Sequence, residues 1–256
     1  MHRLFFVGYA IKPKRMRFSL CKQNFRTMKL INNVLSLFYP RLCASCGDAL
    51  QQNEQCICLN CMLHLPETQF HKEHFNPLRS VFDGRVPVEE TTALMSYKKA
   101  NHTQKILHNL KYKGQKEIGA VLGEYLGGQL LTEERYRGIQ YILPIPLHPK
   151  KQRKRGYNQS EWIAKGLSKG MGIPYLKDVL IRSQFTDTQT KKNRFARWQN
   201  VKEVFEVRNP EKIAYTHVLV CDDVLTTGAT TEAAIRKLLE VDGVRVSVAT
   251  LAATTL

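Results

Sequence analysis

Residues 218–231 constrain the fold of this chain more than any other segment. The first four, VLVC, are apolar without interruption and predict a buried strand, because a strand covered on both faces shows no polar alternation. Two aspartates and a small, threonine-rich turn follow, and residues 231–239 then have the spacing of an amphipathic helix. A β-branched run comes next at 244–249, so the order strand, helix, strand predicts a parallel α/β sheet.

The turn at residues 226–230 has the composition of an anion-binding site. It follows the carboxyl end of a strand, where open α/β sheets bind their ligands, and it enters a helix whose N–H groups attract a phosphate. Gly228 permits a positive φ or a close backbone approach. Helix capping by Thr230 or Thr231 is a simpler explanation of the hydroxyls, but it leaves the two aspartates unexplained.

Asp222 and Asp223 are adjacent acids that repel each other and cost desolvation energy after a buried strand. Ribose hydroxyls and a hydrated Mg²⁺ would account for both. The order apolar strand, Asp-Asp, Thr-Thr-Gly-x-Thr resembles the phosphoribosyl-pyrophosphate (PRPP) signature of type I phosphoribosyltransferases. The resemblance implies that the aspartates are the catalytic pair, holding the ribose 2′ and 3′ hydroxyls. It also implies a 5-phosphate cradle made of Thr226, Thr227, Gly228, Ala229 and Thr230.

Residues 143–160, LPIPLHPKKQRKRGYNQS, form a second informative block. The block leaves a short apolar run at 141–145, and we expect a loop at 146–155 because prolines carry the chain out of the sheet. Five cations stand within six positions, a concentration of donors that suits pyrophosphate. A solvated basic loop is the alternative. The candidate pyrophosphate-binding residues are His148, Lys150, Lys151, Arg153 and Arg155.

These two blocks, with LKYKG at 110–114 and TDTQ at 186–189, resemble the ComF family of competence proteins from residue 28 to the C-terminus. The order of elements is also similar to the synthase-type domain of glutamine PRPP amidotransferase. The resemblance implies a type I phosphoribosyltransferase-like parallel sheet flanked by helices. It further implies a long mobile loop at 182–200 that closes over pyrophosphate, with the loop residues Thr186, Gln189, Arg194 and Asn200.

Other segments show simple periodicity. Residues 91–97 read as a strand, and residues 159–167 as a helix. Apolar positions at 106–110 and 118–126 predict two helices joined by the basic turn at 111–114. A leading helix is expected at 30–38, before the cysteines.

Five of the seven cysteines fall between residues 43 and 61, which favours metal ligation over a disulfide framework. Two C-x-x-C pairs, Cys43 with Cys46 and Cys58 with Cys61, suit a tetrahedral structural Zn²⁺. Cys56 competes with Cys58 as a ligand, but C-L-N-C has the conventional spacing. Redox centres are the alternative, although no thioredoxin-like βαβ context surrounds the pairs.

The formal net charge is +17, which indicates anionic partners such as nucleic acid, nucleotides or phosphosugars. Residues 1–27 carry seven of these charges and no acid, and are expected to be an unstructured extension, a mis-assigned start or a basic nucleic-acid-binding arm. We therefore divide the chain into this extension, a zinc-finger module with its leading helix at 28–68, and a phosphoribosyltransferase-like domain at 69–256. No run of 18 apolar residues occurs, so no membrane insertion is predicted.

Two functions follow from the family resemblance. The first is a PRPP-binding cytoplasmic protein that handles incoming single-stranded DNA in natural competence, working with a helicase and a recombination mediator. Aromatic residues beside cationic runs, Tyr157, Phe195 and Trp198, could stack bases there. The second is an active phosphoribosyltransferase that moves ribose 5-phosphate from PRPP, with Mg²⁺, to an unidentified nucleobase-like acceptor. The sequence names no acceptor site.

Overall fold

The computed structural model describes residues 40–97, 102–182 and 205–254. The chain divides into two units, Met1–Arg41 and Leu42–Leu256, and the elements described below belong to the second. The basic extension, the expected helix at 30–38, and Phe195 and Trp198 lie outside the described residues. So do the four candidate loop residues Thr186, Gln189, Arg194 and Asn200. The domain boundaries at 27/28 and 68/69 stay predictions.

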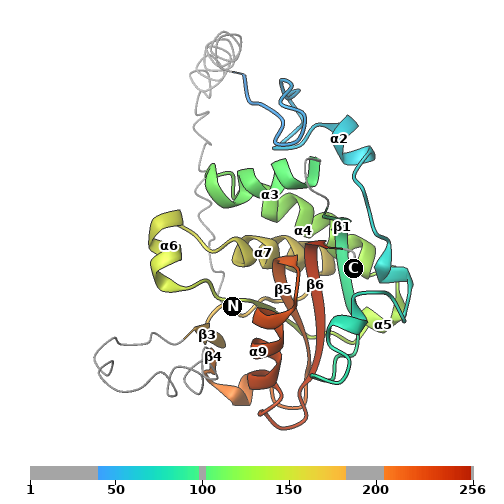
Figure 1. Cartoon of the computed structure of the whole chain (residues 1–256), viewed down its shortest axis with the longest axis vertical. Coiled ribbons are helices and arrows are strands. Elements are labelled where there is room, and N and C mark those ends of the chain that lie inside the picture. The colour runs from blue at the N-terminus through green and yellow to red at the C-terminus, as the bar shows by residue number, and fades with distance from the viewer. Residues whose placement is uncertain (1–39, 98–101, 183–204, 255–256) are drawn as a thin grey trace, which may run out of the picture. The chain divides into compact units, whose positions relative to one another are not determined.

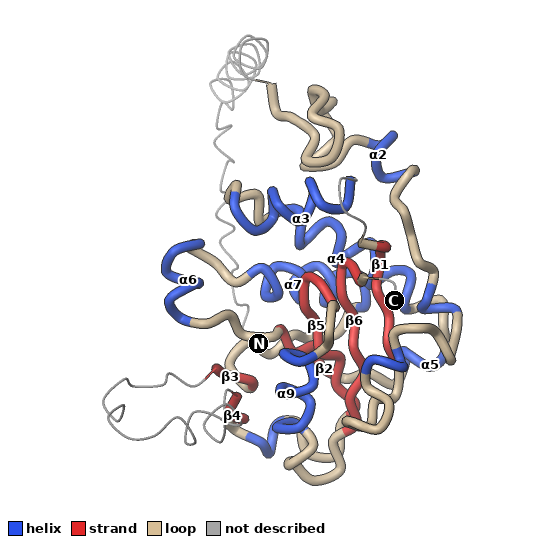
Figure 2. The backbone as a smooth tube through the Cα atoms, in the orientation of Figure 1, coloured by secondary structure: helices blue, strands red, loops and turns tan. Residues whose placement is uncertain are grey.

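Four parallel strands form the central sheet in the order β1-β6-β5-β2 (Figures 1 and 2). Strand β5 pairs with β6 from His217 opposite Arg245 to Leu225 opposite Ala253. Between these two strands the chain crosses over through a helix, so the predicted βαβ unit and its parallel sheet are confirmed. The strands are β1 (Thr91–Ser96), β2 (Tyr141–Pro144), β5 (His217–Leu225) and β6 (Arg245–Ala253).

Helices cover both faces of the sheet, as the uninterrupted apolar strands require. On β5, Leu219 and Cys221 pack toward one face and Val218 and Val220 toward the other. Helix α9 (Ala229–Leu238) covers the second face, and three helices gather on the first (Figure 1). They are α3 (His102–Tyr112), α4 (Glu117–Leu130) and α7 (Gln159–Met171), which confirms the three helices predicted there.

Helices α4 and α7 touch backbone to backbone through glycines spaced four residues apart. A Cβ atom on Gly123 would lie 2.4 Å from the Ile163 carbonyl oxygen, and one on Gly166 would lie 2.1 Å from the Ala120 carbonyl oxygen. Neither distance is compatible with a side chain, so these positions require glycine. The close packing fixes the start of α7 relative to the helical layer. The glycines at this contact are Gly119, Gly123, Gly127, Gly166 and Gly170.

The structure corrects the sequence analysis at two places. Strand β5 does not end at Cys221 but continues through both aspartates to Leu225, because β6 continues to pair with it. The expected loop at 146–155 is largely helix α6 (Pro149–Arg155). Pro149 is tolerated in its first turn, where the missing N–H has no partner to lose, and Gly156 ends it at a φ of 83°.

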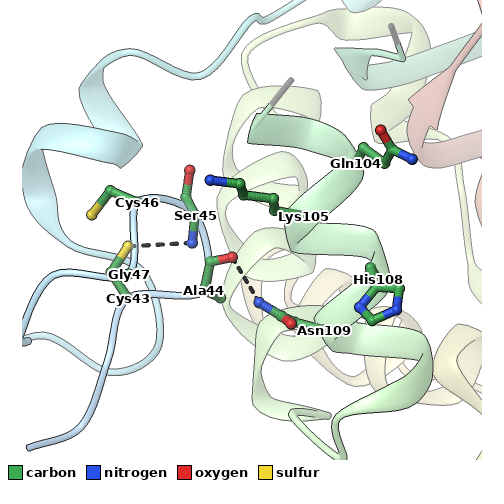
Figure 3. A pocket seen from close by; sticks show the side chains of 9 residues that line it. All are labelled: Cys43, Ala44, Ser45, Cys46, Gly47, Gln104, Lys105, His108 and Asn109. Atoms are coloured by element: carbon green, nitrogen blue, oxygen red, sulfur yellow. Dashed lines mark hydrogen bonds between the residues drawn. The ribbon is translucent and has the colours of Figure 1, made fainter. Parts of the chain in front are cut away.

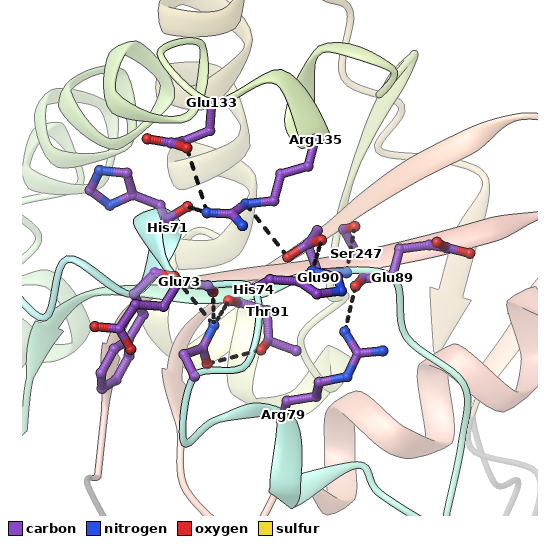
Figure 4. A network of polar contacts seen from close by, with 12 residues as sticks. His71, Glu73, His74, Arg79, Glu89, Glu90, Thr91, Glu133, Arg135 and Ser247 are labelled. Carbon is purple, nitrogen blue, oxygen red and sulfur yellow. Dashed lines mark hydrogen bonds and ion pairs between the residues drawn. The ribbon is translucent and has the colours of Figure 1, made fainter.

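The amino end of the sheet is held by a network around the buried Glu90 (Figure 4). His74 Nδ1 lies 2.6 Å from Glu90 Oε1, and Arg135 Nε lies 3.8 Å from Oε2. The Glu90 N–H donates to Ser247 Oγ on β6 at 3.1 Å. These contacts join three segments that are distant in sequence, so Glu90 has a structural role.

The remaining elements are short. In the described parts of the chain, no helix is both long and apolar enough to cross a membrane. A two-stranded antiparallel sheet pairs β3 with β4 beside the gap at 183–204. The short elements are α2 (Leu59–Leu63), η1 (Phe70–Lys72), η2 (Arg79–Val81), α5 (Glu134–Arg137), β3 (Leu180–Arg182), β4 (Phe205–Val207) and η5 (Pro210–Lys212).

Candidate functional site

The first aspartate of the acid pair, Asp222, lies near the carboxyl end of β5, beside the start of α7. Its Oδ1 accepts a hydrogen bond from Ser160 Oγ at 2.7 Å and another from the Asp223 N–H at 2.8 Å. Asn158 positions this serine, since its side chain caps α7 by accepting from the Ser160 N–H at 3.2 Å. The carboxylate is therefore held by neutral donors, and no ion pair within the described residues neutralises it.

The second aspartate, Asp223, is more deeply buried, with 7% of its side chain exposed. Its Oδ1 lies 3.1 Å from Nζ of Lys111, the penultimate residue of α3. Its Oδ2 is buried with no hydrogen-bond partner among the described residues. A buried carboxylate oxygen without a partner is costly, so it marks a position where a ligand hydroxyl or a hydrated cation would be stabilised.

Two acids so close together cannot both ionise freely. Burial, and after it the neighbouring Asp223 charge, raise the pKa of Asp222 to about 7. Lys111 and the hydrogen bond from Ser160 oppose this rise. A carboxyl group at the end of a sheet whose pKa lies near 7 is typical of ligand sites.

The turn after β5 presents an open surface. Thr226, Thr227 and Thr230 are exposed, whereas Gly228 is buried with a φ of 74°. Gly228 is the N-cap of α9 and receives no side-chain cap, so the alternative explanation of the threonine hydroxyls as caps is wrong. A Cβ atom on Gly228 would also lie 2.4 Å from Val81 Cγ1. The positive φ and the contact with Val81 each require a glycine here, and a close approach to a phosphate stays a prediction.

The basic block divides into two faces because it is helical. Lys151, Lys154 and Arg155 share one face of α6 and line a cavity with the end of α3, whereas Lys150 and Arg153 are exposed and do not line it. His148 accepts from the Lys150 N–H at 3.2 Å and caps the helix. The cavity measures about 350 Å³, and its lining residues are Lys111, Tyr112, Gly114, Lys151, Lys154 and Arg155.

Tyr157 is not the exposed aromatic that the sequence suggested. It is half-buried against the helical core, and its hydroxyl donates to the Leu110 carbonyl oxygen. Tyr112, which precedes the turn into α4, is the exposed aromatic of this region, at 68% exposure. The difference arises because α6 and α7 fold back on α3, a contact that local sequence does not encode.

The four cysteines of the two C-x-x-C pairs come together. Their sulfur atoms lie within 4.8 Å of one another, and Cys46 Sγ lies 3.8 Å from Cys58 Sγ. A tetrahedral metal with bonds of about 2.3 Å separates its sulfur ligands by about 3.8 Å. Backbone N–H groups donate to three of the sulfurs, as suits thiolates. Cys56 is buried outside the cluster. The cluster therefore suits a structural metal such as zinc, held by four cysteines: Cys43, Cys46, Cys58 and Cys61.

The cysteine segment packs on α3 through polar contacts. Asn109 Nδ2 donates to the Ala44 carbonyl oxygen at 2.9 Å (Figure 3). Ser45 Oγ lies 2.8 Å from His102 Nδ1 at the other end of the helix. Because Lys111 stands on the same helix, the cysteine segment and the acid pair share one support.

Residues 158–255 match the family model described as "Phosphoribosyl transferase domain". Over these residues the chain resembles that domain. Its homologues include the DNA utilization protein YhgH of Shigella flexneri, 27% identical over 199 residues, 77% of this chain and 83% of the relative. Competence protein F of Haemophilus influenzae is 32% identical over 143 residues, 54% of this chain and 62% of that protein.

Two solved structures are similar to parts of this chain, at low identity and low TM-score. Glutamine PRPP amidotransferase from B. subtilis is 19% identical with a TM-score of 0.35, over 51% of this chain and 26% of that chain. Adenine phosphoribosyltransferase from Leishmania tarentolae is 16% identical with a TM-score of 0.34, over 59% of this chain and 74% of that chain. In this chain, the domain assignment follows from the parallel sheet and the family model.

Sequence reasoning missed several contacts of the candidate site. Lys111 lies in the LKYKG segment and Ser160 ends the basic block, but nothing in the sequence pairs either of them with the aspartates. Arg85 donates to the Thr227 carbonyl oxygen at 3.4 Å and has no sequence signal. Arg182 is half-buried beside Phe205, and burial lowers its pKa. The Asp222 charge partly opposes this, so Arg182 and Asp222 are electrostatic neighbours.

Proposed function

We propose that this chain binds PRPP or a related phosphoribosyl ligand in the cytoplasm and handles incoming single-stranded DNA during DNA uptake. The observation that carries the first part is the acid pair on β5, which has a buried, unpartnered carboxylate oxygen and lies beside an exposed, threonine-rich turn. The family model matched over residues 158–255 supports the same ligand class.

In this proposal each group meets one part of the ligand. Asp222 and Asp223 hold the ribose hydroxyls, and residues 226–230 receive the 5-phosphate with backbone N–H groups and hydroxyls. Basic residues of the α6 segment, His148, Lys150, Lys151, Arg153 and Arg155, bind the pyrophosphate. Mg²⁺, when bound with the ligand, neutralises pyrophosphate charge. The roles of Thr186, Gln189, Arg194 and Asn200 stay predictions from the family resemblance.

The second part rests on the relatives and on charge. Two homologues carry the names DNA utilization protein and Competence protein F. A net charge of +17 suits a phosphate backbone, which binds basic proteins by releasing counterions. The partners we propose are single-stranded DNA and, by family resemblance, a competence helicase and a recombination mediator.

The test of the ligand site is calorimetry with PRPP and Mg²⁺. Asp222→Ala with Asp223→Ala should abolish binding, because both ribose contacts are lost. A control with the same change of charge is Glu211→Ala with Asp242→Ala, two exposed acids away from the turn, and it should bind normally. Unchanged affinity in the Asp222/Asp223 variant contradicts the proposed site.

An active transferase releases pyrophosphate from PRPP, whereas a protein that only binds PRPP does not. If the chain is an active transferase, a single turnover with PRPP and a suitable nucleobase releases pyrophosphate in proportion to the acceptor. If it is a binding protein, PRPP stays intact with every base and with DNA. Coupled detection of pyrophosphate, with the Asp222/Asp223 variant as the blank, separates these two outcomes.

We also propose that the metal of the four-cysteine cluster is Zn²⁺. The purified protein should contain about one zinc, measured by mass spectrometry of the native protein or by atomic absorption. Cys61→Ser removes a ligand and should lose the metal, whereas Cys56→Ser should keep it because Cys56 lies outside the cluster. Equal metal loss in both variants contradicts this ligand set.

A further inference from the structure

The cavity between α3 and α6 contains two residues that the proposed PRPP contacts leave unused, Tyr112 and Lys154. Tyr112 is the last residue of α3, and 68% of it is exposed. Lys154 is exposed on the face of α6 that lines the cavity. In the described structure, neither side chain forms a hydrogen bond or an ion pair, so neither side chain has an evident role in holding the fold together.

Tyr112 is supported as a flat platform. The guanidinium carbon of Arg155 lies 5.5 Å from the centre of its ring, and the His108 ring lies 5.1 Å away on the preceding turn. Arg155 is itself fixed, because it donates a hydrogen bond to Gln159 Oε1 on α7. An aromatic ring kept in place by a cation and still open to solvent can accept another flat ring by stacking.

The charge of the cavity is uniform. Four of its six lining residues are cationic, and none of the six is acidic. Lys111 is already paired with Asp223, and Arg155 donates to Gln159 besides being a proposed pyrophosphate contact. Lys151 and Lys154 are the lining cations whose side chains have no such bond in the described structure. The volume of about 350 Å³ falls at the lower end of the range of small-ligand sites, roughly 300 to 1,000 Å³.

An exposed aromatic ring beside lysines is the combination that binds single strands, in which bases stack on aromatic side chains while cations follow the phosphates. A duplex does not fit this chemistry, because its bases are already stacked on one another. We propose that the α3–α6 cavity holds one nucleotide of single-stranded DNA, with the base on Tyr112 and its flanking phosphates on Lys151 and Lys154. This assignment rests on the DNA-handling part of the proposed function.

The cavity lies next to the acid pair. Lys111 lines the cavity and also contacts Asp223, 3.1 Å away, in the acid pair. A strand in the cavity would therefore lie next to the phosphoribosyl ligand. Both anions would compete for Lys151, so saturating PRPP should weaken DNA binding while leaving the stacking contact on Tyr112 in place.

The experiment measures the anisotropy of a fluorescein-labelled dT12 bound to the full chain. Tyr112→Ala should weaken binding about 5- to 100-fold, as is usual for loss of one stacked base. Tyr112→Trp should restore it, because the indole ring stacks as well. Lys154→Gln should weaken binding and reduce the slope of log affinity against log salt by about 0.7, since one phosphate contact on a single strand is lost.

The matched control is Phe75→Ala. Phe75 is also an exposed aromatic, at 81%, with the Arg79 guanidinium carbon 5.6 Å from its ring centre, but it lines no part of this cavity. A dT12 with abasic sites throughout should bind the wild type and Tyr112→Ala alike, because it has no base to stack. PRPP calorimetry on Tyr112→Ala should match the wild type, as the proposed PRPP contacts do not include that residue.

The outcomes separate the two proposals. If wild type binds dT12 and Tyr112→Ala binds it equally well, the cavity assignment is overturned while the proposed function stands. If wild type binds no single-stranded DNA at low salt, the DNA-handling function fails and the cavity assignment fails with it. Tighter binding of a 12-nucleotide oligo(rU) than of dT12 would overturn the assignment to DNA.

Discussion

Two ends of one sheet bury carboxylates in different ways. At the amino end, Glu90 lies 2.6 Å from His74 and 3.8 Å from Arg135, and its backbone is tied to β6 (Figure 4). Its Oε2 accepts no hydrogen bond in the described structure, but it faces the Arg135 guanidinium. At the carboxyl end, Asp222 forms no ion pair among the described residues and lies beside a second carboxylate, whose Oδ2 has no hydrogen-bond partner there. The first arrangement stabilises the fold, whereas the second leaves part of its stabilisation to a ligand.

The largest effect should come from the amino end. Glu90→Ala removes the buried acid of this ion network and leaves Arg135 with less compensation, at a cost of about 3–5 kcal/mol in the free energy of unfolding. Chemical denaturation measures the change. Exposed Glu89→Ala on the neighbouring position should change stability by less than about 0.5 kcal/mol. A near-neutral Glu90→Ala variant would break the distinction between the two ends.

At the carboxyl end, removing an acid should increase the stability of the fold instead of lowering it. The pKa of Asp222 is raised to about 7 from an ordinary value of 3.8, so its contribution to stability is full below about pH 4 and is lost as the pH rises through 7. Asp222→Asn removes the buried charge, and at pH 8 it should stabilise the folded state by about 2 kcal/mol. Thermal unfolding should show a clearly larger gain at pH 8 than at pH 5.

The same Asp222→Asn variant should lose PRPP affinity, because the amide is a poorer acceptor for ribose hydroxyls and carries no charge toward Mg²⁺. A gain in stability together with a loss of binding is the signature of a group kept for its ligand. If the variant is destabilised at both pH values, Asp222 resembles Glu90 and the comparison fails.

A smaller effect is expected at the turn after β5. Gly228→Ala adds a Cβ atom 2.4 Å from Val81 Cγ1 at a φ of 74°, and should cost about 1–3 kcal/mol of stability. Gly114→Ala has a similar φ of 72° and open space around its Cβ atom, so it isolates the cost of the backbone conformation alone. Equal losses in the two variants would show that contact with Val81 contributes nothing.

The sequence carried the local part of the fold. Apolar runs without alternation predicted the buried strands, and helical spacing predicted α3, α4, α7 and α9, because these signals depend on neighbours along the chain. The cysteine spacing selected the four residues whose sulfurs converge. The sequence missed helix α6, since its cation-rich segment has no apolar stripe to reveal a helix.

By itself, then, the sequence determined which residues are available for chemistry: the aspartate pair, the threonine turn, the basic block and the cysteines. Only the tertiary structure decided their partners. Lys111 meets Asp223 and Ser160 meets Asp222 because glycines let α4 and α7 pack in backbone contact and place the helical layer over β5. Such contacts join residues distant along the chain, and no local pattern encodes a distance through space.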